Sequence, residues 1–200
     1  MTRRMTLALA VLLLAVSGLQ PSYESFAQAR GGFTTLLAGT TLKGWNMVGD
    51  ANWEVLDGAV QATKGAGGYL VTPDSYGDFQ LTAEFWVSDD ANSGIFIRCQ
   101  DPKTITAANS YEVNIYDKRP DQSYRTGGIV DVAKPMAMIN TGGKWNTFDI
   151  TAQGTKLIVV LNGMKTVDMD HKGHARGPIA LQYGMGSSMV KFRNVRIRTL

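Results

Sequence analysis

The sequence has little that could hold a fold together covalently or carry the more familiar catalytic motifs. It contains one cysteine, Cys99, in 200 residues, so a disulfide within the chain is impossible. No long segment repeats its apolar residues with the 3.6-residue period of a helix. Hydrophobic packing between strands must therefore supply the stability. Cys99 falls on the apolar side of its segment, where a lone cysteine acts as a small hydrophobe.

Several classes of protein are disfavoured by missing motifs and by low charge. The chain has no P-loop, no Rossmann glycine fingerprint and no G-x-S-x-G nucleophile motif. Its two histidines, His171 and His174, lie three residues apart beside a glycine, which predicts a solvated loop and neither a metal site nor a catalytic triad. A formal net charge of +3 is too small to indicate a nucleic-acid partner. We expect no metal and no cofactor.

The first 29 residues have the pattern of an export signal. Arg3 and Arg4 precede an apolar run at residues 5–16, and Ala27-Gln28-Ala29 is a small-x-small cleavage site. The run is too short to span a membrane. We predict cleavage after Ala29 and export to the periplasm or the medium. Residues 30–200 then form a single domain with a net charge of about +2, because Arg3, Arg4 and Glu24 are removed.

The remaining chain shows the spacing of an all-β protein. Glycine and other turn signals recur about every ten residues, and Asp57-Gly58 and Asn162-Gly163 predict two-residue hairpin turns. Ten to twelve strands in this length fit a two-sheet jelly-roll sandwich. Residues 118–143 are polar, contain Pro120 and Pro135, and show a strand period only at 128–132. We expect them to form a long excursion over the sheet.

Residues 78–117 contain three segments in which apolar and polar side chains alternate with period two. Together with later strands, their apolar positions predict a core of Phe79, Leu81, Phe85, Ile95, Ile97, Val113, Ile115, Leu181 and Val195. The opposite positions, if the segments share one sheet, place on one face Glu84, Trp86, Phe96, Arg98, Glu112, Asn114 and Tyr116. Gln182 joins them if its strand has the same register.

This predicted face is unusual for a surface that only contacts solvent. Its carboxylates, guanidinium, amides and aromatic rings are typical of a site for a polar, ring-shaped molecule, most plausibly a sugar. Paired-carboxylate hydrolysis is not supported, because no Glu-x-Asp-x-x-Glu strand occurs. Arg98 and Glu112 could instead form a structural ion pair. If Arg98 and Glu112 both lie on this predicted face, Arg98 would lower the pKa of Glu112.

The chain resembles the 3-keto-disaccharide hydrolase family, exported bacterial domains with a concanavalin-like, laminarinase-like jelly roll. The resemblance rests on ordered motifs along nearly the whole mature chain. They are F-x-x-L-L-x-G-x-x-L-x-G-W at 33–45, W-E-V-L-D-G at 53–58, Y-G-D-F-Q-L-x-x-E-F at 76–85, N-S-G-I-F-I-R at 92–98, Y-E-V-N-I-Y-D at 111–117, W-N at 145–146, L-N-G at 161–163, L-Q at 181–182 and F-R-N-V-R-I at 192–197.

The resemblance implies cleavage of 3-keto-glycosides, the oxidised di- or oligosaccharides. A ketone at C3 acidifies the hydrogen at C2, so that a base can remove it and the C1 substituent can leave by β-elimination, with water added later. Glu112 would be the base, and Arg98 and Gln182 would stabilise the oxyanion. The acid would be Glu84 or Asp117. Trp86, Phe96, Asn114 and Tyr116 would contact the sugar.

Three positions depart from the family pattern. Asn114 stands where the family usually has glutamine, and Val130 where it commonly has tyrosine. Tyr183-Gly184-Met185 follows Gln182 where the family has a histidine. These departures concern substrate preference and catalysis, not the fold. Two other functions remain open: a non-catalytic carbohydrate-binding or lectin-like module, and an interaction domain whose groove holds a peptide or another subunit. The sequence does not specify the sugar, the linkage or the oligomeric state.

Overall fold

The computed structural model describes residues 32–184 and 188–200, and they form two antiparallel sheets without any α-helix. The larger, eight-stranded sheet follows the order β11-β10-β9-β6-β13-β4-β3, and β1 also pairs with β13. The strands are β1 (Thr34–Leu37), β3 (Glu54–Leu56), β4 (Ala59–Ala62), β6 (Phe79–Val87), β9 (Trp145–Gln153), β10 (Lys156–Leu161), β11 (Met164–Asp170) and β13 (Val190–Thr199).

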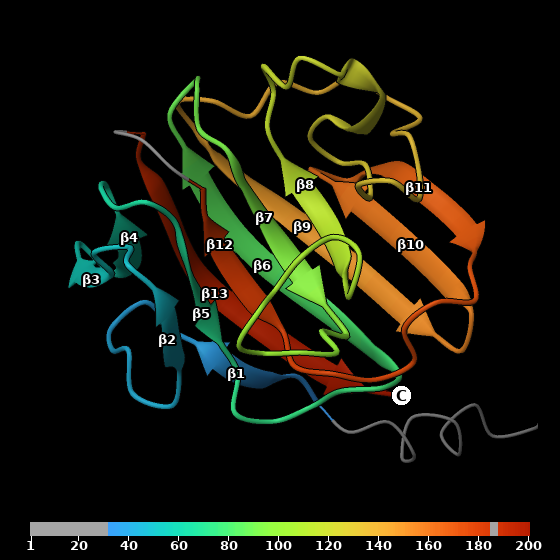
Figure 1. Cartoon of the computed structure of the whole chain (residues 1–200), viewed down its shortest axis with the longest axis horizontal. Helices are drawn as coiled ribbons and strands as arrows, with labels where there is room; N and C mark the ends of the chain where they lie inside the picture. The colour runs from blue at the N-terminus through green and yellow to red at the C-terminus, as the bar shows by residue number, and fades with distance from the viewer. Residues whose placement is uncertain (1–31, 185–187) are drawn as a thin grey trace, which may run out of the picture.

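The smaller sheet has five strands in the order β2-β5-β12-β7-β8 and lies against the larger one (Figure 1). Its strands are β2 (Asn46–Gly49), β5 (Gly68–Val71), β7 (Ser93–Ile97), β8 (Tyr111–Ile115) and β12 (Ala180–Tyr183). Both predicted hairpin turns are present, since Asp57-Gly58 joins β3 to β4 and Asn162-Gly163 joins β10 to β11. Asp57 and Asn162 take positive φ angles of 51° and 52°, as type I′ turns require. The predicted all-β two-sheet sandwich is confirmed.

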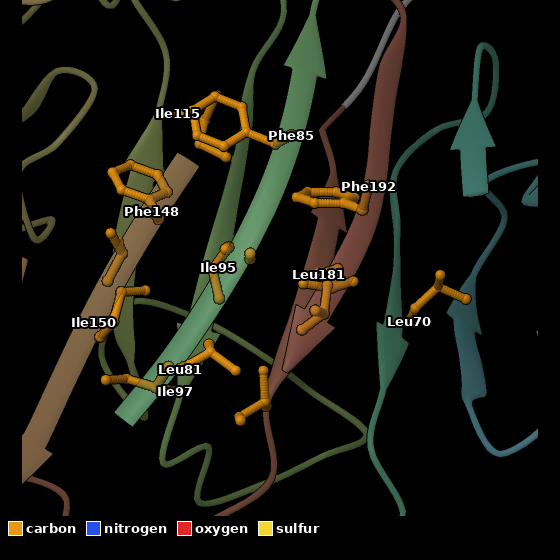
Figure 2. Close-up of a cluster of buried hydrophobic side chains, with 14 of the residues drawn as sticks. Leu70, Leu81, Phe85, Ile95, Ile97, Ile115, Phe148, Ile150, Leu181 and Phe192 are labelled. Carbon is orange, nitrogen blue, oxygen red and sulfur yellow. The ribbon is translucent and has the colours of Figure 1, made fainter. Parts of the chain in front are cut away.

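The core fills the space between the sheets (Figure 2). Every residue predicted for it is at most 3% exposed, including Phe79, Ile97 and Val195. Phe85 of the larger sheet stacks on Phe148, with ring centroids 4.9 Å apart, and Ile95, Ile115 and Leu181 of the smaller sheet belong to the same buried cluster. Period-two alternation therefore identified the inward face correctly on the five strands that carry these residues, β6, β7, β8, β12 and β13.

Two long connections cover parts of the smaller sheet. The excursion over residues 118–143 contains a short 3₁₀ helix, η2 (Gln122–Tyr124), and lies beside β8 and β11 (Figure 1). Part of it extends the sheet beyond β8, because Val130 N–H donates to the Glu112 carbonyl at 3.0 Å and Asn114 N–H donates to the Gly128 carbonyl at 3.0 Å. The loop between β7 and β8 crosses the outer face of the smaller sheet and packs Ile105 onto it.

The predicted export signal and its cleavage site after Ala29 lie outside the described residues, so export stays a prediction. In the part of the chain that the structure describes, no helix has the length and apolarity needed to cross a membrane.

Candidate functional site

The sandwich has two outer faces on opposite sides, and the polar residues predicted to share one face are divided between them. Strand β6, with Glu84 and Trp86, belongs to the larger sheet, whereas Phe96, Glu112, Asn114 and Gln182 point outward from the smaller one. The prediction that these six residues form one surface is therefore wrong. Both sheets turn their apolar faces to a common core, so their polar faces must point in opposite directions.

Glu84 and Trp86 take part in a network on the outer face of the larger sheet. Glu84 accepts hydrogen bonds from Arg193 Nε at 2.7 Å and Asn194 Nδ2 at 2.8 Å. Partial burial works to raise the pKa of Glu84, but these two donors leave it below its ordinary value. Trp86 lies under the Lys191 ammonium, 5.5 Å from the ring centroid. Neither residue can reach a ligand held by the smaller sheet.

Arg98 lies at one end of the sandwich and is not on the outer face of the smaller sheet. It follows β7 with a φ of +54°, which ends the alternation of that strand. Its guanidinium donates to the carbonyls of Gly77, Gly154 and His174 at 2.9 to 3.1 Å, and to Asp78 Oδ1 at 3.0 Å. It is 1% exposed. The predicted role of Arg98 at the oxyanion, and its ion pair with Glu112, are both wrong.

Asp117, at the end of β8, holds the excursion in place through hydrogen bonds. Its carboxylate accepts hydrogen bonds from the hydroxyls of Thr126 and Thr141 and from the backbone N–H groups of Thr141 and Gly142, and it lies 3.6 Å from Arg125. These contacts commit both carboxylate oxygens to holding the excursion, at the end of β8 and away from the row of polar residues on the smaller sheet. The prediction of Asp117 as an acid is therefore not supported by its surroundings. The neighbouring Tyr116 is half-buried, and its contact with a sugar stays a prediction.

The outer face of the smaller sheet is called the floor below, and it comprises Tyr69, Gln182, Gly94, Phe96, Asn114 and Glu112. Strand register places four of these in one row across β5, β12, β7 and β8. The pairs are Tyr69 with Gln182, Gln182 with Gly94, and Gly94 with Asn114. Glu112 lies on the same face of β8 two residues before Asn114, and its partner on β7 is Phe96. Alternation predicted that Glu112 and Asn114 share a face of β8, and the observed register adds Gln182, which the sequence placed there only if its strand had the same register.

Glu112 is the carboxylate that the floor holds in an apolar setting. It is 8% exposed, and its carboxylate makes no hydrogen bond or ion pair with any described residue. Burial raises the pKa of Glu112 to about 7; Arg119 opposes this shift and Asp131 adds to it. The expected lowering by Arg98 is wrong, because that guanidinium is committed elsewhere. A carboxyl that titrates near neutral pH can both accept and donate a proton there.

Phe96 is part of the floor but is not open to a ligand. It is 1% exposed and is buried with Val71, Cys99, Ile105 and Ala180 beneath the loop between β7 and β8. Its predicted contact with sugar is therefore wrong. The predicted burial of Cys99 is confirmed, and burial raises the pKa of this thiol to about 12, which makes it unreactive near neutral pH.

A pocket of about 450 Å³ opens at the end of the row, lined among others by Tyr69, Gln182, Lys103, Ile105 and Asn92. The Tyr69 hydroxyl donates to the Ile105 carbonyl at 3.3 Å and accepts from Gln182 Nε2 at 3.4 Å. The Tyr69 ring meets Phe96 edge to face, with centroids 5.4 Å apart. A partly exposed aromatic ring beside an amide and a lysine is a suitable surface for a polar ring.

Two amide oxygens on either side of Gly94 lack donors. Asn114 is fully buried; its Nδ2 donates to the Tyr124 carbonyl, but its Oδ1 has no hydrogen-bond partner, and the same holds for Gln182 Oε1. Unpaired buried oxygens are costly. A hydroxyl group or a protonated carboxyl near Gly94 would satisfy them.

The two histidines lie away from the floor and are not simply solvated, contrary to the prediction. His171 Nδ1 is 3.0 Å from the buried Tyr111 hydroxyl, and both imidazoles pack edge to face on the Tyr111 ring. Within residues 32–184 and 188–200, no group of three or more His, Cys, Asp or Glu side chains could hold a metal ion.

The raised pKa of Glu112 predicts that this residue destabilises the fold above neutral pH. Its pKa rises from 4.5 to about 7 on folding. Below pH 4 the carboxyl is protonated in both states and has no effect. Between pH 4.5 and 7 the unfolded chain ionises first, so stability is lost as pH rises and the loss is complete above pH 7. Glu112→Gln should therefore raise the free energy of unfolding by about 2–3 kcal/mol at pH 8 and by nearly nothing at pH 4.

Urea unfolding of wild type and Glu112→Gln at the two pH values measures this difference. An equal effect at pH 4 and pH 8 would show that Glu112 does not titrate as its burial indicates.

Three residues near the site, Tyr69, Gly94 and Arg119, were not predicted from sequence, and Val130 was identified there only as a departure from the family pattern. Tyr69 lies on a strand that was recognised, but its face was not assigned. Gly94 interrupts a strand pattern, and a glycine there is a signal of close approach by another group. Arg119 and Val130 lie in the excursion, which has little periodicity to place them. Val130, the position where tyrosine was expected, is hydrogen-bonded beside Glu112 through its backbone and lies on the edge of the floor.

Comparison with known proteins agrees with this architecture. The family model described as 3-keto-alpha-glucoside-1,2-lyase-like domain matches residues 32–198. A search among curated proteins gave no match. Two crystal structures from Parabacteroides distasonis ATCC 8503, both provisionally described as glycosyl hydrolases, are similar to the chain. The first has 26% identity and a TM-score of 0.72 and covers 85% of this chain and 100% of its own. The second has 21% identity and a TM-score of 0.73, with coverages of 90% and 98%.

A carbohydrate-binding module has the same fold. The carbohydrate-binding module CBM66 from Bacillus subtilis is 17% identical with a TM-score of 0.62, covering 82% of this chain and 98% of its own. At this identity the likeness shows the fold alone.

Proposed function

The chain belongs to the family of 3-keto-alpha-glucoside-1,2-lyase-like domains, and from that membership we propose that it cleaves 3-keto-glycosides with Glu112 as the base. The family is carbohydrate-active, and the two similar structures from Parabacteroides distasonis are provisionally described as glycosyl hydrolases. The substrate would lie across the floor of the smaller sheet, between the excursion and the loop that follows β7.

The unpaired, buried carboxyl of Glu112 carries this proposal. A buried carboxylate without a cation or a hydrogen-bond donor is unfavourable for folding, and strongly perturbed carboxyls concentrate at functional sites. A structural ion pair would give Glu112 a partner, and Arg98, the partner considered from sequence, is hydrogen-bonded at the end of the sandwich. Its pKa of about 7 also suits a base that works at neutral pH, because a base is most effective when its pKa lies near the operating pH.

The proposed reaction begins with transfer of the C2 proton to the Glu112 carboxylate. The electron pair of the C2–H bond forms the C2–C3 double bond of an enolate, and the C3 carbonyl oxygen takes the negative charge. The enolate then reforms the carbonyl, a C1–C2 double bond forms, and the C1–O bond breaks. The departing oxygen takes a proton from water, since neither Glu84 nor Asp117 lies at the floor. The hydroxide that this leaves then adds to C1 and Glu112 returns its proton to C2, so that one water is consumed, the Glu112 carboxylate is regenerated and the net reaction is hydrolysis.

Two donors near the floor could stabilise the enolate oxygen in place of Arg98. Gln182 lies in the row beside Gly94, and its Nε2 makes only a long bond of 3.4 Å to Tyr69. Arg119 is the cation that acts on Glu112, and its side chain forms no ion pair within the described residues. Hydrogen bonds to a developing oxyanion in a site with little water are among the larger contributions to catalysis.

A non-catalytic carbohydrate-binding module is the second candidate. It is favoured by one observation: the pocket at Tyr69 is lined by residues typical of sugar contact, and Glu112 is not among them. Such a module would bind a sugar without changing it.

Incubation with methyl 3-keto-α-D-glucopyranoside separates the two functions. The proposed enzyme releases methanol, and in D₂O it exchanges the C2 hydrogen of the substrate; unoxidised methyl α-D-glucopyranoside is the control and should remain intact. Binding of the keto sugar with neither methanol release nor exchange would favour the binding module. Both readouts are followed by NMR.

A further inference from the structure

We propose that Gly94 is a positioning residue for Glu112: the missing side chain in the centre of the floor allows the Glu112 carboxyl to lie across β7. This inference rests on the proposed role of Glu112 as the base. It assigns to a glycine, which has no chemistry of its own, the task of holding that carboxyl over the row formed by Gln182, Gly94 and Asn114.

The local geometry shows how closely the two residues meet. A Cβ atom added to Gly94 would lie 3.2 Å from Glu112 Cγ, 3.3 Å from the Val113 carbonyl oxygen and 3.4 Å from Glu112 Oε1. The carboxyl of Glu112 thus extends over the Cα of Gly94, although its register partner on β7 is Phe96. Any side chain at position 94 would have to displace that of Glu112, because the backbone of β8 cannot move as easily.

The backbone itself does not require glycine at this position. Gly94 lies inside β7, the strand between β12 and β8, and it is absent from the glycines with positive φ. Glycine in a strand interior weakens the strand, and a common reason for it is close approach of another group. Here that group is the Glu112 side chain.

The surroundings of Glu112 explain why its position matters. Arg119 and Asp131 of the excursion are the charged groups that act on it, and Tyr69 of β5 is the titratable group on its other side. Strand β7 contributes Gly94 and Phe96 there, and neither carries a charge. Strand β7 therefore shields the Glu112 carboxyl from water on one side. The unpaired amide oxygens of Gln182 and Asn114 lie on the two strands that flank β7.

Gly94→Ala is expected to lift the Glu112 carboxyl away from β7 toward solvent. Hydration then favours the ionised form, so the pKa of Glu112 should fall by about one unit or more. Turnover of methyl 3-keto-α-D-glucopyranoside should fall about 10-fold, because the contacts require a shift of a few tenths of an ångström, less than the displacement of about 1 Å that costs about 10²-fold. The acidic limb of the pH–rate profile should move to lower pH by the same amount as the pKa.

The titration does not depend on turnover, so failure of this inference and failure of the proposed function are distinguishable. The Glu112 side-chain carboxyl is followed by ¹³C NMR from pH 4 to 9 and is assigned by its absence in Glu112→Gln. Gly77→Ala is the matched control. A Cβ atom there would meet its nearest neighbours at 3.6 and 3.7 Å, which is ordinary contact, and it should leave the titration unchanged.

A folded Gly94→Ala protein whose Glu112 titrates as in wild type would overturn the inference, even if wild type proves active. If Gly94→Ala does not fold, Glu112→Asp gives the same test, because the shorter side chain withdraws its carboxyl from β7. We expect the pKa of that aspartate to lie near its ordinary value. An aspartate pKa that remains near 7 would also overturn the inference.

Discussion

Glu112→Gln is expected to reduce turnover of methyl 3-keto-α-D-glucopyranoside by about 10²–10⁴-fold, the usual effect of losing a general base. Glutamine has the shape of the protonated carboxyl but cannot accept the C2 proton. Sugar affinity should change little, because the hydroxyl groups of the substrate still meet Gln182 and Tyr69. The loss should therefore appear in kcat, with KM nearly unchanged.

The matched control is the same substitution on the other side of the sandwich. Glu84 is also a strand glutamate on an outer face, but it is bonded to Arg193 and Asn194 of the larger sheet. Glu84→Gln should leave turnover as in wild type. Full activity of Glu112→Gln would contradict the assignment of the base, and loss of activity in both variants would indicate that the substrate does not bind on the floor.

Arg98→Ala is expected to lower the free energy of unfolding by about 3–5 kcal/mol, because a large buried side chain is removed and several carbonyls lose their donor. The guanidinium holds together three separate segments through the carbonyls of Gly77, Gly154 and His174, and it pairs with Asp78. Alanine would leave a cavity and those carbonyls without donors. The measurement is urea unfolding at pH 7.

Two variants give the comparison that this prediction needs. Arg98→Lys keeps the charge but cannot form the planar fork, so we expect an intermediate loss. Arg176→Ala removes an exposed arginine with a single hydrogen bond to the Ser75 carbonyl at 2.7 Å, and its effect should stay within about 0.5 kcal/mol. If Arg98→Ala left stability unchanged and instead raised KM, the residue would contact substrate, as the sequence suggested.

Arg98 does not follow the alternation of the residues that precede it in β7. Period two holds only while the backbone stays extended, and β7 ends at Ile97, one residue before the arginine. The positive φ of Arg98 then turns the side chain away from the face that counting assigns to it. The local sequence does not predict this turn, because residues with positive φ are most often Gly, Asn or Asp, and residue 98 is an arginine.

The two hairpin turns, the family and the inward face of five strands, β6, β7, β8, β12 and β13, could be predicted from the sequence, and through them the fold. These features depend on short-range patterns: an alternation of apolar side chains, an Asn-Gly or Asp-Gly pair, and an ordered set of motifs. Alternation also placed Glu112 and Asn114 on one face of β8, whereas Gln182 joins them because the structure places β12 in the same sheet.

Only the tertiary structure decided which strands share a sheet. Alternation fixes the two faces of one strand but contains no information about its neighbours, so the outer face of β6 and the outer face of β8 looked equivalent in sequence. Pairing across long separations placed Glu84 and Trp86 on the far side of the core. The same long-range contacts buried Glu112 beside Gly94 and away from Arg98, and a pKa raised toward 7 follows from that burial, which no local pattern specifies.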